Sequence, residues 1–175
     1  MMELNFKSGM RGIARAVLVL GVTAIAAIAQ AAGSCSVSSG GMVFGTYQPI
    51  TFAGKLNSVA ASSTATVSLV CTGITIGGYT IGLGPSFNGP GDRMSVRYLN
   101  NSTGVDGLVA FNAFIDPGYS LIWGDGIRGV LLRGVMPPGG SNRTHTVYGR
   151  VPEGQTLLKA GTYSSAMTIT ISYDP

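Results

Sequence analysis

The chain has 175 residues and a net charge of +4 at pH 7, with 11 basic and 7 acidic residues. Charged residues make up 10% of the sequence, against roughly 25% in a typical soluble domain. The basic residues form no cluster with interleaved aromatic residues, so nucleic acid is not an expected partner.

The first 31 residues have the features of a secretory signal peptide. Basic residues precede an uncharged, mostly apolar run at residues 16–29, and small residues allow cleavage after Ala31. The run is too short to span a bilayer core of about 30 Å as a stable helix. We therefore predict a signal peptide over residues 1–31 and one secreted domain over residues 32–175. An uncleaved N-terminal anchor is the alternative reading.

The rest of the chain is rich in glycine and in short alternating segments, which favours an all-β fold. Of the 27 glycines, 24 follow residue 31, and no segment has the pattern of an amphipathic helix. Short strands between glycine-rich turns are typical of an antiparallel sandwich or barrel. In chain order, we expect strands over residues 42–47, 64–71, 78–83, 94–99, 108–115, 129–135, 144–148 and 163–173.

Two cysteines occur in the whole sequence, both early in the predicted secreted domain. Cys35 opens that domain, and Cys71 ends the alternating strand that contains Val67 and Leu69. In an oxidising compartment a lone pair of cysteines predicts a disulfide. A metal site would need more ligands, and His145 is the single histidine, so we expect no bound metal.

The last strand carries an intact apolar stripe. Met167, Ile169, Ile171 and Tyr173 point to one side, while the intervening Thr and Ser residues point to the other. This period of two is the pattern of a half-buried strand. No later segment of the sequence is available to pair with it, so we expect a partner molecule to complete it.

The motifs resemble, in order, the spore coat protein U domain family, which includes subunits of archaic (Csu-type) chaperone–usher pili. The resemblance covers nearly all of residues 32–175. The matching segments are residues 35–37, 43–47, 67–72, 93–94, 108–116, the Trp-Gly-Asp-Gly block at 123–126, 147–155 and 161–173.

The resemblance implies an immunoglobulin-like antiparallel sandwich that lacks its final strand. A periplasmic chaperone would lend a strand to the empty groove, an outer-membrane usher would export the subunit, and a neighbouring pilus subunit would replace the chaperone. Met167, Ile169, Ile171 and Tyr173 would form the chaperone and donor-strand interface. The protein would pass through the periplasm to the cell surface and contribute to adhesion and biofilm formation.

One departure from the family pattern concerns the donor strand that usually precedes the first cysteine. Cleavage after Ala31 leaves three residues before Cys35, whereas a donor needs roughly ten. We therefore expect a subunit that accepts a donor strand without giving one, as at a fibre tip. The apolar loop residues Tyr119, Leu121, Ile122 and Trp123 are then candidates for surface contact. The alternative for Trp123 is a side chain that fills the core at one end of the sandwich.

Catalysis finds little support in the sequence. His145 lies between two threonines on an expected strand, and the acidic residues are spread over turns, where they usually bend or cap the backbone. We predict no catalytic residue, no cofactor and no small-molecule substrate. Two alternatives to a pilus subunit stay open at this point. One is a self-contained secreted spore-coat or matrix protein, and the other is an extracellular enzyme.

Overall fold

The computed structural model describes residues 33–47, 59–73, 77–87, 89–102, 107–136, 141–155 and 158–174. All of them belong to the unit Ala31–Pro175. The predicted signal peptide and its cleavage site lie outside the described residues, so both stay predictions. Within the described residues, no helix is long and apolar enough to cross a membrane.

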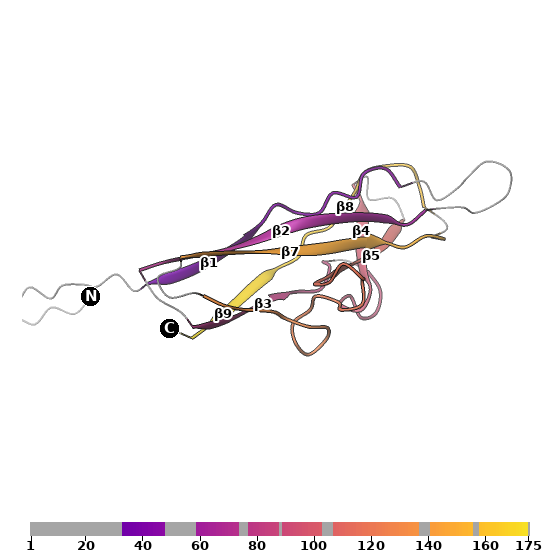
Figure 1. Ribbon diagram of the computed structural model, residues 1–175. Coiled ribbons are helices and arrows are strands. Elements are labelled where there is room, and N and C mark those ends of the chain that lie inside the picture. Colours follow the sequence, from indigo (N-terminus) through magenta and orange to yellow (C-terminus); the bar gives the residue numbers. More distant parts are fainter. Residues whose placement is uncertain are drawn as a thin grey trace, which may run out of the picture. The chain divides into compact units, whose positions relative to one another are not determined.

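The described residues form two antiparallel sheets (Figure 1). The larger sheet has the strand order β1-β2-β7-β5-β4-β8, and the smaller has the order β6-β3-β9. The predicted all-β antiparallel sandwich is therefore confirmed. The strands are β1 (Ser34–Ser39), β2 (Ala61–Thr72), β3 (Gly78–Leu83), β4 (Arg97–Asn101), β5 (Leu108–Phe114), β6 (Leu132–Val135), β7 (Asn142–Val151), β8 (Tyr163–Ser164) and β9 (Ile169–Tyr173).

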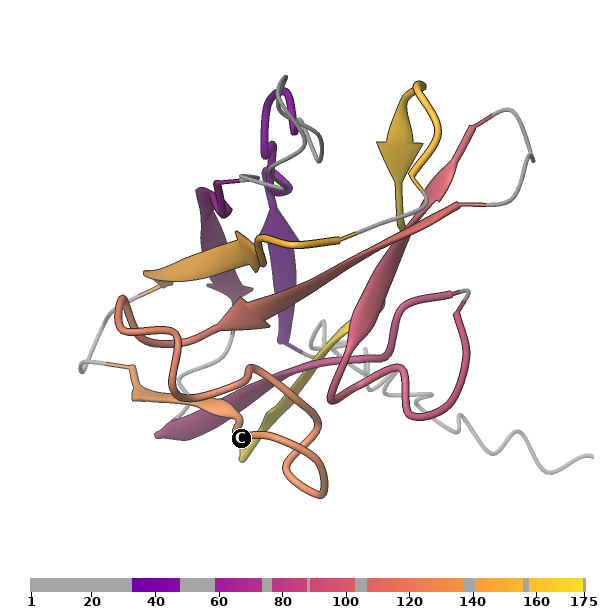
Figure 2. The same cartoon turned by 90° about the vertical axis from the view of Figure 1, so that its right-hand side faces the viewer.

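The core lies between the two sheets. Figure 1 shows β1, β2 and β7 as one layer and β3 and β9 as the facing layer, and Figure 2 shows β5 running obliquely to the other strands. Val67 and Leu69 of β2, Ile81 of β3 and Val147 of β7 are all completely buried. Along β2, buried side chains alternate with exposed ones, because successive residues of a strand point to opposite faces.

The last strand, β9, is paired along one of its two edges. It is antiparallel to β3, in a register that runs from Tyr79↔Tyr173 to Leu83↔Ile169. An earlier strand, β3, supplies the partner along this edge, and the expectation that another molecule completes the C-terminal stripe stays a prediction. The predicted alternation is confirmed, since Ile169, Ile171 and Tyr173 are partly buried and the residues between them are exposed.

Several predicted strand bounds need correction. Residues 42–47 form no strand, and β1 lies earlier in the chain. β4 starts at Arg97 because the Asp92 carboxylate accepts a hydrogen bond from Met94 N at 2.9 Å and shapes a turn there. The segment 129–135 becomes a strand only from Leu132. The long C-terminal strand divides, because β8 pairs with β4 whereas β9 pairs with β3.

The predicted disulfide is present. Cys35 of β1 and Cys71 of β2 are paired residues in the antiparallel register, and their sulfur atoms lie 2.07 Å apart. The bond therefore fixes the edge strand of the larger sheet to its neighbour. The two cysteines are 36 positions apart in the sequence, and closing a loop of that size stabilises a fold by roughly 3–4 kcal/mol in the chain-entropy model.

Candidate functional site

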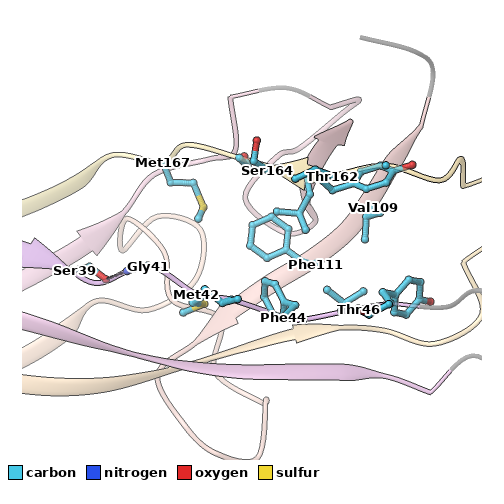
Figure 3. A pocket seen from close by; sticks show the side chains of 18 of the residues that line it. Ser39, Gly41, Met42, Phe44, Thr46, Val109, Phe111, Thr162, Ser164 and Met167 are labelled. Atoms are coloured by element: carbon cyan, nitrogen blue, oxygen red, sulfur yellow. Dashed lines mark hydrogen bonds between the residues drawn. The ribbon is translucent and has the colours of Figure 1, made fainter. Parts of the chain in front are cut away.

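An apolar groove of about 1130 Å³ opens between the two sheets (Figure 3). One wall consists of residues 37–39 of β1 and the segment 41–47 that follows, and the other wall comes from residues 158–169. The floor consists of core side chains from β3, β4, β5 and β7 and from the loop before β6. These side chains belong to Leu83, Leu99, Val109, Phe111, Trp123 and Val151.

The segment 41–47 forms its wall without joining a sheet. Within the described part of the chain, its main-chain groups make no hydrogen bond to another main-chain group. Met42 and Phe44 instead pack over β7 at Gly149, where a Cβ atom would lie 2.6 Å from Met42 Sδ and 2.7 Å from Phe44 Cζ. The Phe44 ring also meets the Phe111 ring edge-on, with centroids 5.7 Å apart. Side-chain packing and hydrogen bonds that involve side chains therefore hold this wall in place, since Val43 N donates to Ser63 Oγ at 3.1 Å and the Tyr47 hydroxyl donates to the carbonyl of Pro152 at 2.9 Å.

The opposite wall keeps the alternation of the C-terminal segment. Tyr163, Ser165, Met167 and Ile169 line the groove and are partly buried, whereas the residues between them are exposed. Between β8 and β9, the carbonyl of Thr168 accepts a hydrogen bond from Gly84 N at 2.8 Å. Among the described residues, the main-chain groups of 165–167 have no main-chain partner. Among the described residues, both walls therefore present main-chain groups without a main-chain partner beside apolar side chains.

The groove is closed at the end nearest the disulfide. Cys35 N donates a hydrogen bond to the Tyr173 hydroxyl at 3.3 Å, which joins β1 to β9. Ile171 and Tyr173 pack against the core and do not line the groove. Of the four residues in the predicted interface, the structure therefore places Met167 and Ile169 in the groove and the other two beyond its closed end. Sequence reasoning missed Ser165, although it is visible as a polar interruption in the stripe.

A groove of this kind is suited to an extended peptide. Main-chain groups on its walls can form ladder hydrogen bonds with an added strand, and apolar side chains of that strand can fill the floor. An exposed edge with an apolar face is also prone to aggregation unless something covers it. The geometry therefore suits strand addition, and we identify no acid–base pair among the groove residues.

Comparison with known proteins identifies the family. The sequence profile of the Spore Coat Protein U domain matches residues 21–170. This chain belongs to that family. A matching solved structure is the CsuC–CsuE chaperone–tip adhesion subunit pre-assembly complex from archaic chaperone–usher Csu pili of Acinetobacter baumannii, with 16% identity and a TM-score of 0.48. That match covers 79% of this chain and 39% of the other chain, so this chain spans less than half of it. No curated protein sequence matches this chain.

The tryptophan of this spore coat U domain does not belong to an exposed contact loop. Trp123 is 2% exposed, and its indole N–H donates to the carbonyl of Ile81 at 2.9 Å. The alternative reading, in which Trp123 fills the core, is therefore the correct one. Of the other three predicted contact residues, Leu121 is exposed, whereas Tyr119 and Ile122 are partly buried.

Two strongly exposed apolar side chains lie elsewhere in this spore coat U domain. Phe87 is 75% exposed and Ile127 is 91% exposed. Their loops are joined by an ion pair in which Arg128 Nη1 lies 3.1 Å from Asp92 Oδ1. Both loops lie between strands that the sequence predicts, but the sequence does not single out Phe87 or Ile127, because a glycine-rich loop gives no information about which side chain faces solvent.

A buried arginine organises the core next to the groove. Arg97 is completely buried, and its guanidinium donates hydrogen bonds to the carbonyls of Leu83, Gly84 and Trp123 at 2.8–3.1 Å. It also donates to the side-chain oxygen of Asn112. Burial lowers the pKa of Arg97 to about 10, so the side chain stays charged at neutral pH. Nothing in the sequence pattern distinguished this arginine from a surface residue.

The titratable groups considered for catalysis have structural contacts in this spore coat U domain. The Tyr79 hydroxyl and His145 Nε2 lie 2.8 Å apart and link β3 to β7. Burial, together with the positive charge of Arg143, lowers the pKa of His145. Asp116 accepts hydrogen bonds from the N–H groups of Leu121 and Ser120, and the pKa of Asp116 is lowered as a result. Within the described residues, no cluster of His, Cys, Asp and Glu could hold a metal ion.

Proposed function

We propose that this chain is a structural subunit of a surface pilus assembled by a periplasmic chaperone and an outer-membrane usher. The apolar groove is the observation that carries this proposal, because its walls hold main-chain groups without ladder partners. A strand from the chaperone, and later one from a neighbouring subunit, would pair with these walls. Membership of the Spore Coat Protein U domain family supports the same role. The protein would travel through the periplasm to the cell surface.

The test is export of the subunit with and without a periplasmic chaperone encoded beside it. We expect a soluble complex of subunit and chaperone, and aggregation or degradation of the subunit alone, because the open groove would stay uncovered. A folded monomer that ignores both the chaperone and added strand peptides would refute the proposal. That outcome would instead favour a self-contained coat or matrix protein.

We propose further that the subunit occupies the fibre tip and contributes to adhesion and biofilm formation. The exposed apolar side chains of Phe87 and Ile127 support a surface contact there. The tip position itself rests on the predicted cleavage after Ala31, which would leave no donor strand. When the subunit is released from its chaperone and no other subunit is present, it should then form no polymers. Homopolymers would exclude the tip position.

Adhesion is tested separately from assembly. The double variant Phe87→Ser/Ile127→Ser should lower attachment of piliated cells to a hydrophobic plastic surface while leaving the number of fibres unchanged. The matched control is Leu108→Ser, which removes an exposed apolar side chain from β5. Equal attachment by all three strains would contradict the contact assigned to Phe87 and Ile127.

A further inference from the structure

Ser165 is a polar residue on the otherwise apolar inner face of the C-terminal wall. It lies in phase with Tyr163, Met167 and Ile169, and all four line the groove. The Ser165 hydroxyl oxygen is buried and has no hydrogen-bond partner among the described residues. Leaving a buried hydroxyl unpaired is unfavourable, so native structures satisfy such groups in almost every case.

The groove itself has little to offer this hydroxyl. The floor is made of apolar side chains, and the indole N–H of Trp123, its one polar group, already donates to the carbonyl of Ile81. The occupant that fits the groove is an extended strand, because in the described part of both walls main-chain groups lack main-chain partners. Inward side chains on neighbouring antiparallel strands have Cβ atoms roughly 4.5–5.5 Å apart. One inward side chain of an added strand would therefore lie beside Ser165.

We propose that Ser165 determines donor specificity by selecting a hydrogen-bonding side chain, such as Ser, Thr or Asn, at one inward position of the incoming strand. This inference rests on the proposed function, in which a neighbouring subunit supplies that strand. An apolar side chain at the same position would leave the Ser165 hydroxyl buried and unpaired. The other inward positions, beside Tyr163, Met167 and Ile169, take apolar side chains.

Such a residue solves a register problem that alternation alone leaves open. A strand that slips by one residue turns its apolar side chains outward, so the groove rejects it. A strand that slips by two residues keeps every apolar side chain inward, and a uniformly apolar groove could not distinguish it. With Ser165 in the wall, the two-residue slip places an apolar side chain against a buried hydroxyl. Ser165 therefore fixes the register of the donor strand to a single position.

The test uses designed peptides of about ten residues, the length of a donor strand, in which Val alternates with Thr between terminal lysines. A panel replaces each inward Val by Ser in turn, and each peptide competes with the chaperone for the full-length subunit. For the unaltered subunit, we expect one Ser-containing peptide to bind about fivefold to tenfold more tightly than the other members of the panel. Ser165→Ala should abolish that preference and make the all-Val peptide the tightest binder. Ser172→Ala, at an exposed position of β9 that does not line the groove, should keep the preference.

The outcomes separate this inference from the proposed function. If no peptide displaces the chaperone, strand addition fails and the inference fails with it. If the all-Val peptide binds but the unaltered subunit and Ser165→Ala rank the panel identically, strand addition stands and the role of Ser165 is refuted. Removing an unpaired hydroxyl should not unfold the subunit, and a thermal unfolding curve of Ser165→Ala checks this.

Discussion

Arg97 illustrates at the scale of one residue how main-chain carbonyl groups hold a buried charge. Its guanidinium is surrounded by the carbonyls of Leu83, Gly84 and Trp123. Arg97→Met keeps a long side chain but leaves these buried carbonyls without a donor. We expect the free energy of unfolding to fall by about 3–5 kcal/mol, as measured by urea denaturation. Arg133→Met, at an exposed position of β6, should change it by less than about 0.5 kcal/mol. Similar losses in both variants would contradict the role assigned to Arg97.

The pair formed by Tyr79 and His145 predicts a pH dependence of stability. Burial and Arg143 hold the pKa of His145 below its usual value, whereas in the unfolded chain a histidine titrates near about 6.5. Below that pH, the unfolded state binds more protons than the folded state, so the free energy of unfolding decreases as the pH is lowered. His145 therefore contributes stability above about pH 6.5 that is lost as pH falls through its lowered pKa.

Thermal unfolding as a function of pH measures this contribution. The midpoint of the unaltered protein should fall as pH drops below about 6.5, and His145→Gln should show a flatter profile over the same range. Asp92, Asp116 and Asp125 also have lowered pKa values, so their contributions are lost in a more acidic range. Parallel profiles for the two proteins would show that the pKa of His145 does not differ between the folded and unfolded states.

At the scale of secondary-structure elements, the sequence pattern predicted which side of a strand is buried better than it predicted which strand pairs with it. Alternation placed β2, β3 and β5 close to their observed bounds, because each lies inside a sheet and buries one or both faces. The same alternation occurs in 42–47, where Met42 and Phe44 are partly buried, yet no strand forms. Periodicity shows which side of a segment is buried, whereas pairing depends on a neighbour brought close by the rest of the fold. The groove falls where such a neighbour is absent.

The alternation of inward and outward side chains along β9 allows a direct test of which residues form the groove wall. Ile169 lines the groove opposite Leu83 in the β3 register, while Thr170 is exposed. Ile169→Asp should abolish recovery of the complex with the chaperone, because a carboxylate would be buried without a partner at a cost of several kcal/mol. Thr170→Asp, one residue along, should leave the yield of complex nearly unchanged. Co-purification from the periplasm measures both, and equal losses would mean that the inward and outward faces are assigned wrongly.

At the scale of the whole molecule, the groove depends on two edges that different parts of the chain supply. β1 comes from the start of the described chain and β9 from its end, and they meet through Cys35 and Tyr173. The sequence could predict an incomplete sandwich through the family resemblance, because the C-terminal stripe is contiguous. It could not predict where the groove closes, since that depends on a contact between residues 138 positions apart.

The disulfide should therefore control one wall of the groove as well as global stability. β1 pairs only with β2 among the described strands, and the wall segment 41–47 follows it directly. Cys35→Ala/Cys71→Ala should lower the free energy of unfolding by roughly 3–4 kcal/mol, because the 36-residue loop between them is no longer closed in the unfolded chain. We also expect faster amide hydrogen exchange in β1 than in β7, since an edge strand without its cross-link opens locally before the core does. Uptake of strand peptides should weaken in parallel. If β1 amides stay as protected as in the oxidised protein, side-chain packing of Val37, Met42 and Phe44 holds the wall, and the disulfide acts on the unfolded chain alone.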